Sequence, residues 1–239
     1  MVPGPYGFEI SESCQACRFS ADGFYCKLPS AVLKDFNDIQ STSAYPKGAH
    51  LFVEKQDSRG IFMLCEGQVK LSFSSSEGRN LILRIARPGE VLGLTAVLAS
   101  APYEVTAETC RPCQVAFVER EDFLQFVADH PQAYPGIVKQ LRANYDGACK
   151  QLRNLGLSSS VSERVGRLLL EWSAGSKETK LGIQISLDMT QAEMGELLGI
   201  SRETVTRTFR QFRDQRLVLL KGSTVTIPNR AALESFVTN

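Results

Sequence analysis

The chain has 239 residues and a mass of 26.4 kDa, with 43% hydrophobic and 22% charged residues. This composition excludes disordered, collagen-like and purely coiled-coil proteins, and the length suits two ordinary domains. The formal net charge of +1 argues against a surface that is basic all over. No apolar run approaches the ~18 residues of a membrane-spanning helix. Because the first basic residue is Arg18, no charged segment precedes an apolar one, and we expect a cytoplasmic protein without a membrane partner.

Residues 1–30 are predicted to form an irregular arm that holds three of the seven cysteines, Cys14, Cys17 and Cys26. An odd number of cysteines in a reducing compartment favours metal binding or redox chemistry over a framework of disulfides. The arm is therefore a candidate sensory element.

Residues 31–125 are predicted to form a small β-roll, with no helix longer than a turn or two between about Ala44 and Phe117. Glycines divide most of this stretch into short alternating runs, which is typical of antiparallel strands joined by tight turns. In residues 69–73 Val, Leu and Phe alternate with Lys and Ser, a turn follows at 76–78, and an apolar run occupies 81–85. This pattern predicts a hairpin.

Residues 126–157 change to the apolar period of a helix. Ile137, Leu141, Ala148, Leu152 and Leu155 fall on one stripe, a spacing that suits a helix packed against a twin. The Gly- and Ser-containing segment 155–160 interrupts this pattern and predicts a hinge between domains.

Residues 158–239 contain the most specific signal in the chain, the segment 190–207. Thr190 and Glu193 form a capping box for a short first helix, Gly199 supplies a tight turn, and Ser201 caps a second helix. This succession predicts a helix-turn-helix, with another helix at 162–174 before it and a hairpin wing at 217–227 after it.

The second helix of this unit has one apolar and one charged face at ~100° per residue. Arginine can donate two hydrogen bonds to guanine, and glutamate can accept one from cytosine, so the charged face suits the major groove of double-stranded DNA. Between Arg202 and Lys221 there are six basic and two acidic side chains, a local charge of +4. A helical hairpin with a merely solvated charged face is the alternative interpretation. The candidate DNA-binding residues are Ser201, Arg202, Glu203, Thr206, Arg207, Arg210 and Lys221.

The order of these elements, together with the segment MTQAEMGELLGISRETVTRTFRQF, resembles the Crp/Fnr family of bacterial transcription regulators over nearly the whole chain. The resemblance implies an α+β fold: an N-terminal cyclic-nucleotide-binding-like β-roll (a double-stranded jelly roll), a long dimerisation helix and a C-terminal winged helix-turn-helix. It implies a homodimer on a palindromic operator with half-sites ~34 Å apart. Arg202, Glu203 and Arg207 would read bases, and an activator would also contact RNA polymerase.

Members of this family that bind cyclic AMP have a Gly-Glu-Leu segment followed by an Arg-Ser pair that holds the phosphate. The corresponding segments here are Gly93-Leu94-Thr95 and residues 102–106, which lack both the glutamate and the arginine. Glu104 would repel a phosphate. We therefore expect no cyclic AMP.

Cys14, Cys17 and Cys26 resemble the cysteine-rich arm of the oxygen-sensing Fnr branch, and Cys113 stands at the position of its fourth cysteine. Four thiolates can hold a 4Fe-4S cluster. The resemblance thus implies an oxygen or redox sensor in which cluster assembly favours dimerisation. The gap between Cys17 and Cys26 is longer than in that branch.

Other uses of the cysteines stay open. Two CxxC pairs, Cys14/Cys17 and Cys110/Cys113, are spaced for a structural zinc site, and the same thiols could switch between thiol and disulfide without metal. Cys110 could also replace Cys113 as a cluster ligand, or a small molecule in the roll could be the signal. Cys65 and Cys149 are expected to be packing residues.

No catalytic constellation is visible, so we do not expect an enzyme. The chain lacks phosphate-loop, zinc-protease and serine-hydrolase motifs, and His50 and His130 are isolated in sequence. A cytosolic metal-binding or electron-transfer protein would explain the cysteines but would have no use for a helix-turn-helix. A sequence-specific DNA-binding regulator accounts for both.

Overall fold

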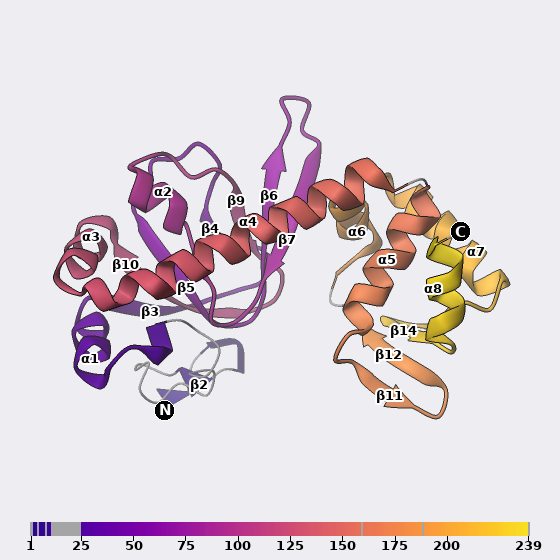
Figure 1. Cartoon of the computed structure of the whole chain (residues 1–239), viewed down its shortest axis with the longest axis horizontal. Helices are drawn as coiled ribbons and strands as arrows, with labels where there is room; N and C mark the ends of the chain where they lie inside the picture. Colours follow the sequence, from indigo (N-terminus) through magenta and orange to yellow (C-terminus); the bar gives the residue numbers. More distant parts are fainter. Residues whose placement is uncertain are drawn as a thin grey trace. The chain divides into compact units, whose positions relative to one another are not determined.

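The computed structural model describes residues 2–3, 5–7, 9–10, 25–158, 160–187 and 189–238. The chain divides into two compact units, as its length predicts (Figure 1). They are Met1–Ala148 and Cys149–Asn239. Among the described helices, none combines the length and the apolar character needed to cross a bilayer.

Two antiparallel four-stranded sheets build the predicted roll, with strand orders β3-β10-β5-β8 and β4-β9-β6-β7. The expected hairpin is the β6–β7 pair, in which Val69 pairs with Ala86 and Ser74 with Asn80. In the arm, a short pair joins β1 (Val2–Pro3) to β2 (Glu9–Ile10). The strands of the roll are β3 (Gln40–Tyr45), β4 (His50–Phe52), β5 (Gly60–Glu66), β6 (Val69–Ser74), β7 (Asn80–Ala86), β8 (Val91–Leu92), β9 (Thr106–Thr109) and β10 (Cys113–Glu119).

The first sheet has a core on each of its faces. Strand β10 shows this alternation, since Cys113 and Val115 belong to the cluster inside the roll, whereas Ala116 and Val118 belong to the cluster under the helices. The outer cluster also contains Tyr25, whose ring stacks on that of Phe36 at 4.3 Å between centroids. The helices and 3-10 turns of this unit are η1 (Pro5–Gly7), η3 (Tyr25–Lys27), α1 (Ser30–Asp38), α2 (Leu94–Ala99), α3 (Arg120–Asp129), η4 (Pro131–Ala133) and α4 (Tyr134–Leu157).

The long helix is shorter than the predicted 126–157. Residue 126 lies within α3, which ends at Asp129, and α4 begins only at Tyr134. The break has a local cause, because Pro131 has no backbone N–H and disfavours helical geometry at His130, where φ is −123° and ψ is 72°. The C-terminal end of α4, at Leu157, matches the predicted hinge.

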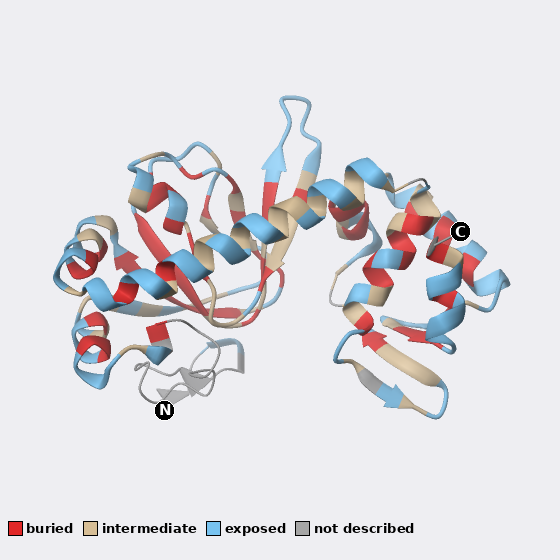
Figure 2. Ribbon diagram, viewed as in Figure 1, coloured by how far each residue is buried: buried red, intermediate tan, exposed pale blue. Residues whose placement is uncertain are grey.

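The apolar residues of α4 separate into two groups. Ile137 is buried and Leu141 is packed against the roll. A second set on an adjacent side of the helix is exposed, and Figure 2 shows much of α4 in the exposed colour. We call this second set the α4 stripe; its members are Tyr134, Val138, Tyr145 and Leu152.

The second unit packs helices on a four-stranded antiparallel sheet of order β11-β12-β14-β13. Val165 and Leu169 of its first helix are buried, as are Phe209 and Phe212 of the charged helix. The helix at 162–174 and the wing were predicted, whereas β11, β12 and α8 were not. The elements are α5 (Val161–Ser173), β11 (Lys177–Thr179), β12 (Gly182–Ser186), α6 (Gln191–Leu198), α7 (Arg202–Asp214), β13 (Leu219–Lys221), β14 (Thr224–Ile227) and α8 (Arg230–Thr238).

Candidate nucleic-acid interface

Helix α6 begins at the predicted capping box. The backbone N–H of Glu193 donates to Thr190 Oγ1 at 3.2 Å, and the N–H of Thr190 donates to Glu193 Oε2 at 2.8 Å. Two amide groups that the helix leaves unpaired are thereby satisfied, which fixes the start of α6.

The turn after α6 requires a residue with positive φ. Gly199 has φ 64° and ψ 35°, and the N–H of Ile200 returns to the carbonyl of Gly195 at 2.9 Å. A side chain at residue 199 would strain this left-handed conformation. The glycine therefore sets the direction in which the chain enters α7.

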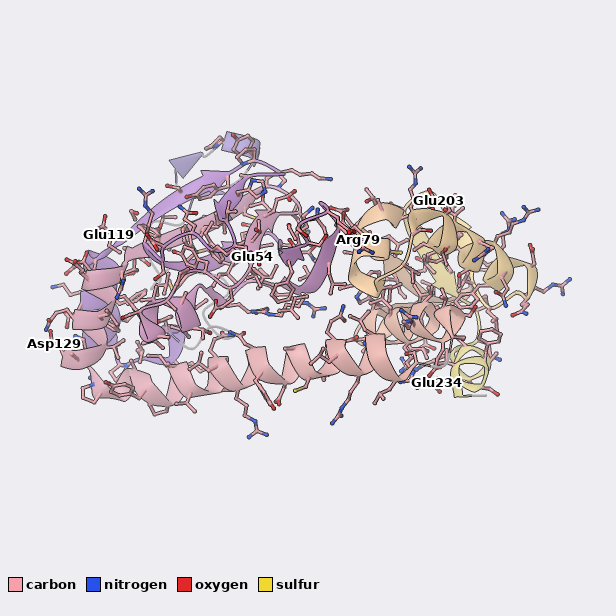
Figure 3. The ribbon with its side chains drawn as sticks, turned by 90° about the horizontal axis from the view of Figure 1, so that it is seen from above. Glu54, Arg79, Glu119, Asp129, Glu203 and Glu234 are labelled. Atoms are coloured by element: carbon pink, nitrogen blue, oxygen red, sulfur yellow. The ribbon has the colours of Figure 1, made fainter. Side chains whose placement is uncertain are left out.

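Ser201 caps the N-terminus of α7, because its Oγ accepts the N–H of Thr204 at 3.2 Å. Glu203 lies in the first turn, and Figure 3 shows it on the surface of the second unit. The pKa of the Glu203 carboxyl is lowered, first because its own backbone N–H donates to it and next because the Ser201 side chain does. The carboxylate is thus held in the ionised form that accepts hydrogen bonds.

The two faces of α7 separate as predicted from the sequence. The buried face consists of Val205, Thr208, Phe209 and Phe212. The side chains proposed to meet DNA all lie outside this core, on the exposed side of the helix. Those exposed residues are Arg202, Glu203, Thr206, Arg207 and Arg210.

Thr206 differs from its neighbours because its hydroxyl is already engaged. Thr206 Oγ1 lies 2.5 Å from Gln191 Oε1 and 3.0 Å from the carbonyl oxygen of Arg202. Sequence reasoning missed Gln191, which as the first residue of α6 connects the two helices of the motif. In helix-turn-helix proteins the first helix crosses the DNA backbone. The position of Gln191 at the start of that helix was the signal that could have identified it.

Lys221 lies in the wing, at the end of β13, and is exposed. Its partner in the hairpin is Thr224. The flexible stem and single charge of a lysine suit a phosphate contact rather than base recognition.

In the roll, Tyr103 fills the interior beside Gly93. Its ring is 2% exposed and stacks on Phe52 at 4.0 Å, and a Cβ added to Gly93 would lie 2.7 Å from that ring. Its hydroxyl donates to the carbonyl of Gly60 at 2.7 Å and lies 3.2 Å from the amides of Arg59 and Gly60. Burial raises the pKa of this phenol. Tyr103 and Gly93 thus pack together in the interior of the roll.

Cys113 is fully buried at the start of β10. Its Sγ lies 3.2 Å from the carbonyl oxygen of Arg111 and 3.3 Å from that of Gln68. Burial raises the pKa of the thiol, although the Gln68 backbone and Arg111 partly oppose this. A cluster ligand has to be a thiolate that faces the metal. As a cluster ligand, the Cys113 sulfur would therefore have to leave these backbone carbonyls and lose its proton.

Cys14, Cys17 and the side chain of Cys26 lie outside the described residues. Within the described part, no three His, Cys, Asp or Glu side chains are grouped to hold a metal. Cys110 is buried, and Cys65 and Cys149 are half-buried.

The histidines are less isolated in the fold than in the sequence. His50 Nε2 lies 3.6 Å from Glu108 Oε2, and His130 Nε2 lies 3.4 Å from Asp35 Oδ2. Both carboxylates come from distant parts of the chain, which is why sequence spacing did not reveal them.

Comparison with known proteins covers both units. Residues 163–236 match the Crp-like helix-turn-helix domain, and residues 42–130 match the cyclic nucleotide-binding domain. The CRP-like cAMP-activated global transcriptional regulator of Mycobacterium tuberculosis (strain H37Rv) is 25% identical over 86% of this chain and 91% of its own length. The nitrogen fixation regulation protein FixK of Bradyrhizobium diazoefficiens is 22% identical over 93% and 92%.

Solved structures show the same fold. The c-di-GMP responsive global regulator CLP of Xanthomonas campestris superimposes with a TM-score of 0.75 at 22% identity, covering 84% of this chain and all of that one. The α+β architecture predicted from the sequence, with its β-roll and its C-terminal helix-turn-helix, is therefore confirmed.

Proposed function

This chain belongs to the Crp/Fnr family of transcription regulators, and from that premise we propose that it binds a palindromic operator as a homodimer. DNA binding and transcription regulation follow from the family. Arg202, Glu203 and Arg207 read bases in the major groove, while Arg210 and Lys221 contact the backbone. We place the protein in the bacterial cytoplasm, where its DNA target lies.

One observation carries this proposal: the capped N-terminus of α7 presents Arg202, Glu203 and Arg207 to solvent while the opposite face is locked in the core. The first turn of a recognition helix is the part that reaches base edges in helix-turn-helix proteins. Thr206 contributes through its methyl group, because its hydroxyl is held by Gln191 and the Arg202 carbonyl.

Selection from random double-stranded DNA by the full-length protein, followed by fluorescence anisotropy on the selected sequence, tests the proposal. We expect an inverted repeat with half-sites one helical turn apart and an affinity that falls steeply as salt rises. Selection of single half-sites, or an affinity independent of sequence, would contradict operator reading by a dimer.

The α4 stripe is the surface proposed for dimerisation. Tyr145 is 70% exposed and Leu152 is 68% exposed, large apolar side chains at a spacing of one heptad. Such residues on one helical side favour burial against an identical helix.

Leu152→Lys tests this surface by placing a charge in the paired stripe. Sedimentation velocity is expected to show a dimer for the natural chain and a monomer for this variant. Arg142→Lys, a charge-preserving change elsewhere on α4, serves as the matched control. A Leu152→Lys variant that stays dimeric would move the interface away from α4.

For the sensory half, the proposal is that Cys14, Cys17 and Cys26 hold a 4Fe-4S cluster that reports oxygen or redox state. The resemblance of this cysteine-rich arm to that of the Fnr branch supports it, whereas the long gap between Cys17 and Cys26 is a departure from that branch. The proposal requires a rearrangement at the fourth ligand. To bind the cluster, the Cys113 thiol would have to leave the carbonyls of Gln68 and Arg111 and lose its proton. Zinc or a thiol switch on the same cysteines is the second candidate.

Anaerobic purification with iron, sulfide and zinc analysis separates these candidates. A cluster predicts a broad absorption band near ~400 nm that air bleaches and about four irons per chain. Cys113→Ser is expected to abolish the band, and Cys65→Ser is the control that should keep it. A band that survives Cys113→Ser but not Cys110→Ser assigns the fourth ligand to Cys110. Stoichiometric zinc without iron would reject the cluster.

Cyclic AMP is not expected to be the signal, although relatives such as the M. tuberculosis regulator are named for it. The supporting observations are that Tyr103 packs against Gly93 and that an exposed glutamate, Glu104, follows it. Equilibrium dialysis with radiolabelled cyclic AMP should show no saturable binding.

A further inference from the structure

A cavity of about 620 Å³ lies in the first unit, between the segment after β7 and the N-terminal half of α4. We call it the α4 cavity. Its wall combines lysines with neutral polar side chains and a few apolar groups. The lining residues are Lys27, Leu28, Arg84, Pro88, Gly89, Glu90, Gln132, Pro135, Gly136, Lys139, Gln140, Ala143 and Asn144.

The charge of the α4 cavity is positive. Among the described lining residues, Glu90 is the one carboxylate, and it is already engaged, because it forms an ion pair with Arg84 and accepts the backbone N–H of Arg87 at 2.8 Å. Lys27 and Lys139 stay available, since neither forms an ion pair with any described residue. Two uncompensated ammonium groups in one hollow favour a ligand with negative charge.

The hydrogen-bonding groups of the cavity wall also favour an anionic ligand. Asn144 Oδ1 accepts from Arg84 Nη2 at 2.9 Å and from Gln140 Nε2 at 3.0 Å. Both acceptor sites of that oxygen are then occupied, so Asn144 has its two Nδ2 hydrogens left to offer. The wall therefore presents mainly donors, which match the acceptor oxygens of phosphate or carboxylate.

The α4 cavity overlaps neither the α4 stripe nor the segment around Gly93 and Tyr103. At ~100° per residue, Lys139 and Ala143 lie roughly 100–160° around the axis of α4 from Val138 and Tyr145. A dimer formed through the α4 stripe would leave the cavity open. Neither Gly93 nor Tyr103 lines it, so it is also distinct from the segment compared with cyclic nucleotide-binding relatives.

We propose that the α4 cavity binds a small metabolite with two or more negative charges, as phosphates or carboxylates. Its ligand would contact η3 of the arm, the 84–90 segment and α4 together. Because α4 is the proposed dimerisation helix, occupancy would alter DNA affinity; this regulatory consequence rests on the proposed function, whereas anion binding itself does not.

Isothermal titration calorimetry with inorganic pyrophosphate and with citrate tests the proposal on the full-length protein without DNA. We expect saturable one-to-one binding of at least one anion at low salt. Lys27→Gln and Lys139→Gln should each weaken it about fivefold, and the double variant should abolish it. Preference for pyrophosphate or for citrate identifies the ligand as a phosphate or a polycarboxylate.

Two controls locate the anion. Lys150→Gln removes an exposed lysine further along α4 and should leave the affinity unchanged. Arg207→Ala should also leave it unchanged, because an anion on the basic face of α7 would be lost there instead. The proposal is overturned if neither anion binds saturably, or if the double lysine variant binds as tightly as the natural chain. Since DNA is absent, these results are independent of operator binding.

Discussion

The two units of this chain present their functional side chains in opposite ways. On α7, the proposed base-reading residues are exposed at a helix terminus that is already capped. In the roll, Tyr103 and Cys113 are buried, and their polar atoms contact backbone groups. The proposed base-reading side chains are therefore already accessible within the second unit, whereas a reaction at Cys113 requires a packed core to open.

The largest expected effect tests how firmly the roll is packed. Tyr103→Ala removes a buried ring stacked on Phe52 together with the hydrogen bonds of its hydroxyl. We expect a loss of ~3–5 kcal/mol in the free energy of unfolding, measured by urea titration with circular dichroism. Tyr103→Phe keeps the ring and should cost only ~1–3 kcal/mol.

The same titration can be read by fluorescence, because the single tryptophan, Trp172, lies in α5 of the second unit. If the units are independent, Tyr103→Ala shifts the circular dichroism transition of the roll but not the Trp172 transition. Equal shifts in both signals would show that the two units unfold as one, which would weaken the comparison.

The second-largest expected effect concerns base reading by the exposed face of α7 in the second unit. Arg207→Ala is expected to cost ~1–3 kcal/mol of binding free energy on the selected operator and little on random DNA, because a bidentate contact to guanine is lost. Arg213→Ala is the matched control: it lies in the last turn of the same helix, away from the base-reading end. Fluorescence anisotropy on both DNAs measures the difference. Equal losses on operator and random DNA would assign Arg207 to the phosphate backbone.

The same contrast explains what could be predicted from the sequence. The helix-turn-helix depends on contacts between residues close in the chain, such as Thr190 with Glu193 and Ser201 with Thr204. Local patterns predict such contacts, so the caps, the turn glycine and the two faces of α7 were found. The hairpin of β6 and β7 was found for the same reason.

Features set by long-range contacts were not predicted. The inward direction of the Cys113 thiol depends on the position of Gln68, 45 residues earlier. The ion pair of Arg84 with Glu90 is local, but the α4 cavity exists only because Asn144 lies 60 residues from Arg84 in sequence and beside it in space. Neither spacing nor composition carries that information.

A smaller expected effect tests whether the turn between α6 and α7 depends on the positive φ of Gly199. Gly199→Ala places a side chain at φ 64° and is expected to lower the stability of the second unit by ~1 kcal/mol, read from the Trp172 unfolding transition. Gly156→Ala is the control, because a Cβ there meets no atom within 4 Å and alanine favours the helix. A Gly199→Ala variant as stable as the natural chain would mean that the turn can be rebuilt without positive φ.

The smallest effect concerns the charge of Glu203. Its folded-state pKa is lowered by hydrogen bonds from its own backbone N–H and, next, from the Ser201 side chain. Ionised Glu203 therefore favours the folded state above the unfolded pKa, and this contribution is lost as the pH falls through the lowered folded value. Ser201→Ala should raise the pKa of Glu203 towards its ordinary value, measured by NMR titration of the carboxyl carbon. Ser162→Ala removes a hydroxyl bonded to Gln211 instead and should leave the titration unchanged. If Ser201→Ala leaves the titration of Glu203 unchanged, the Ser201 side chain does not set the pKa of this carboxyl.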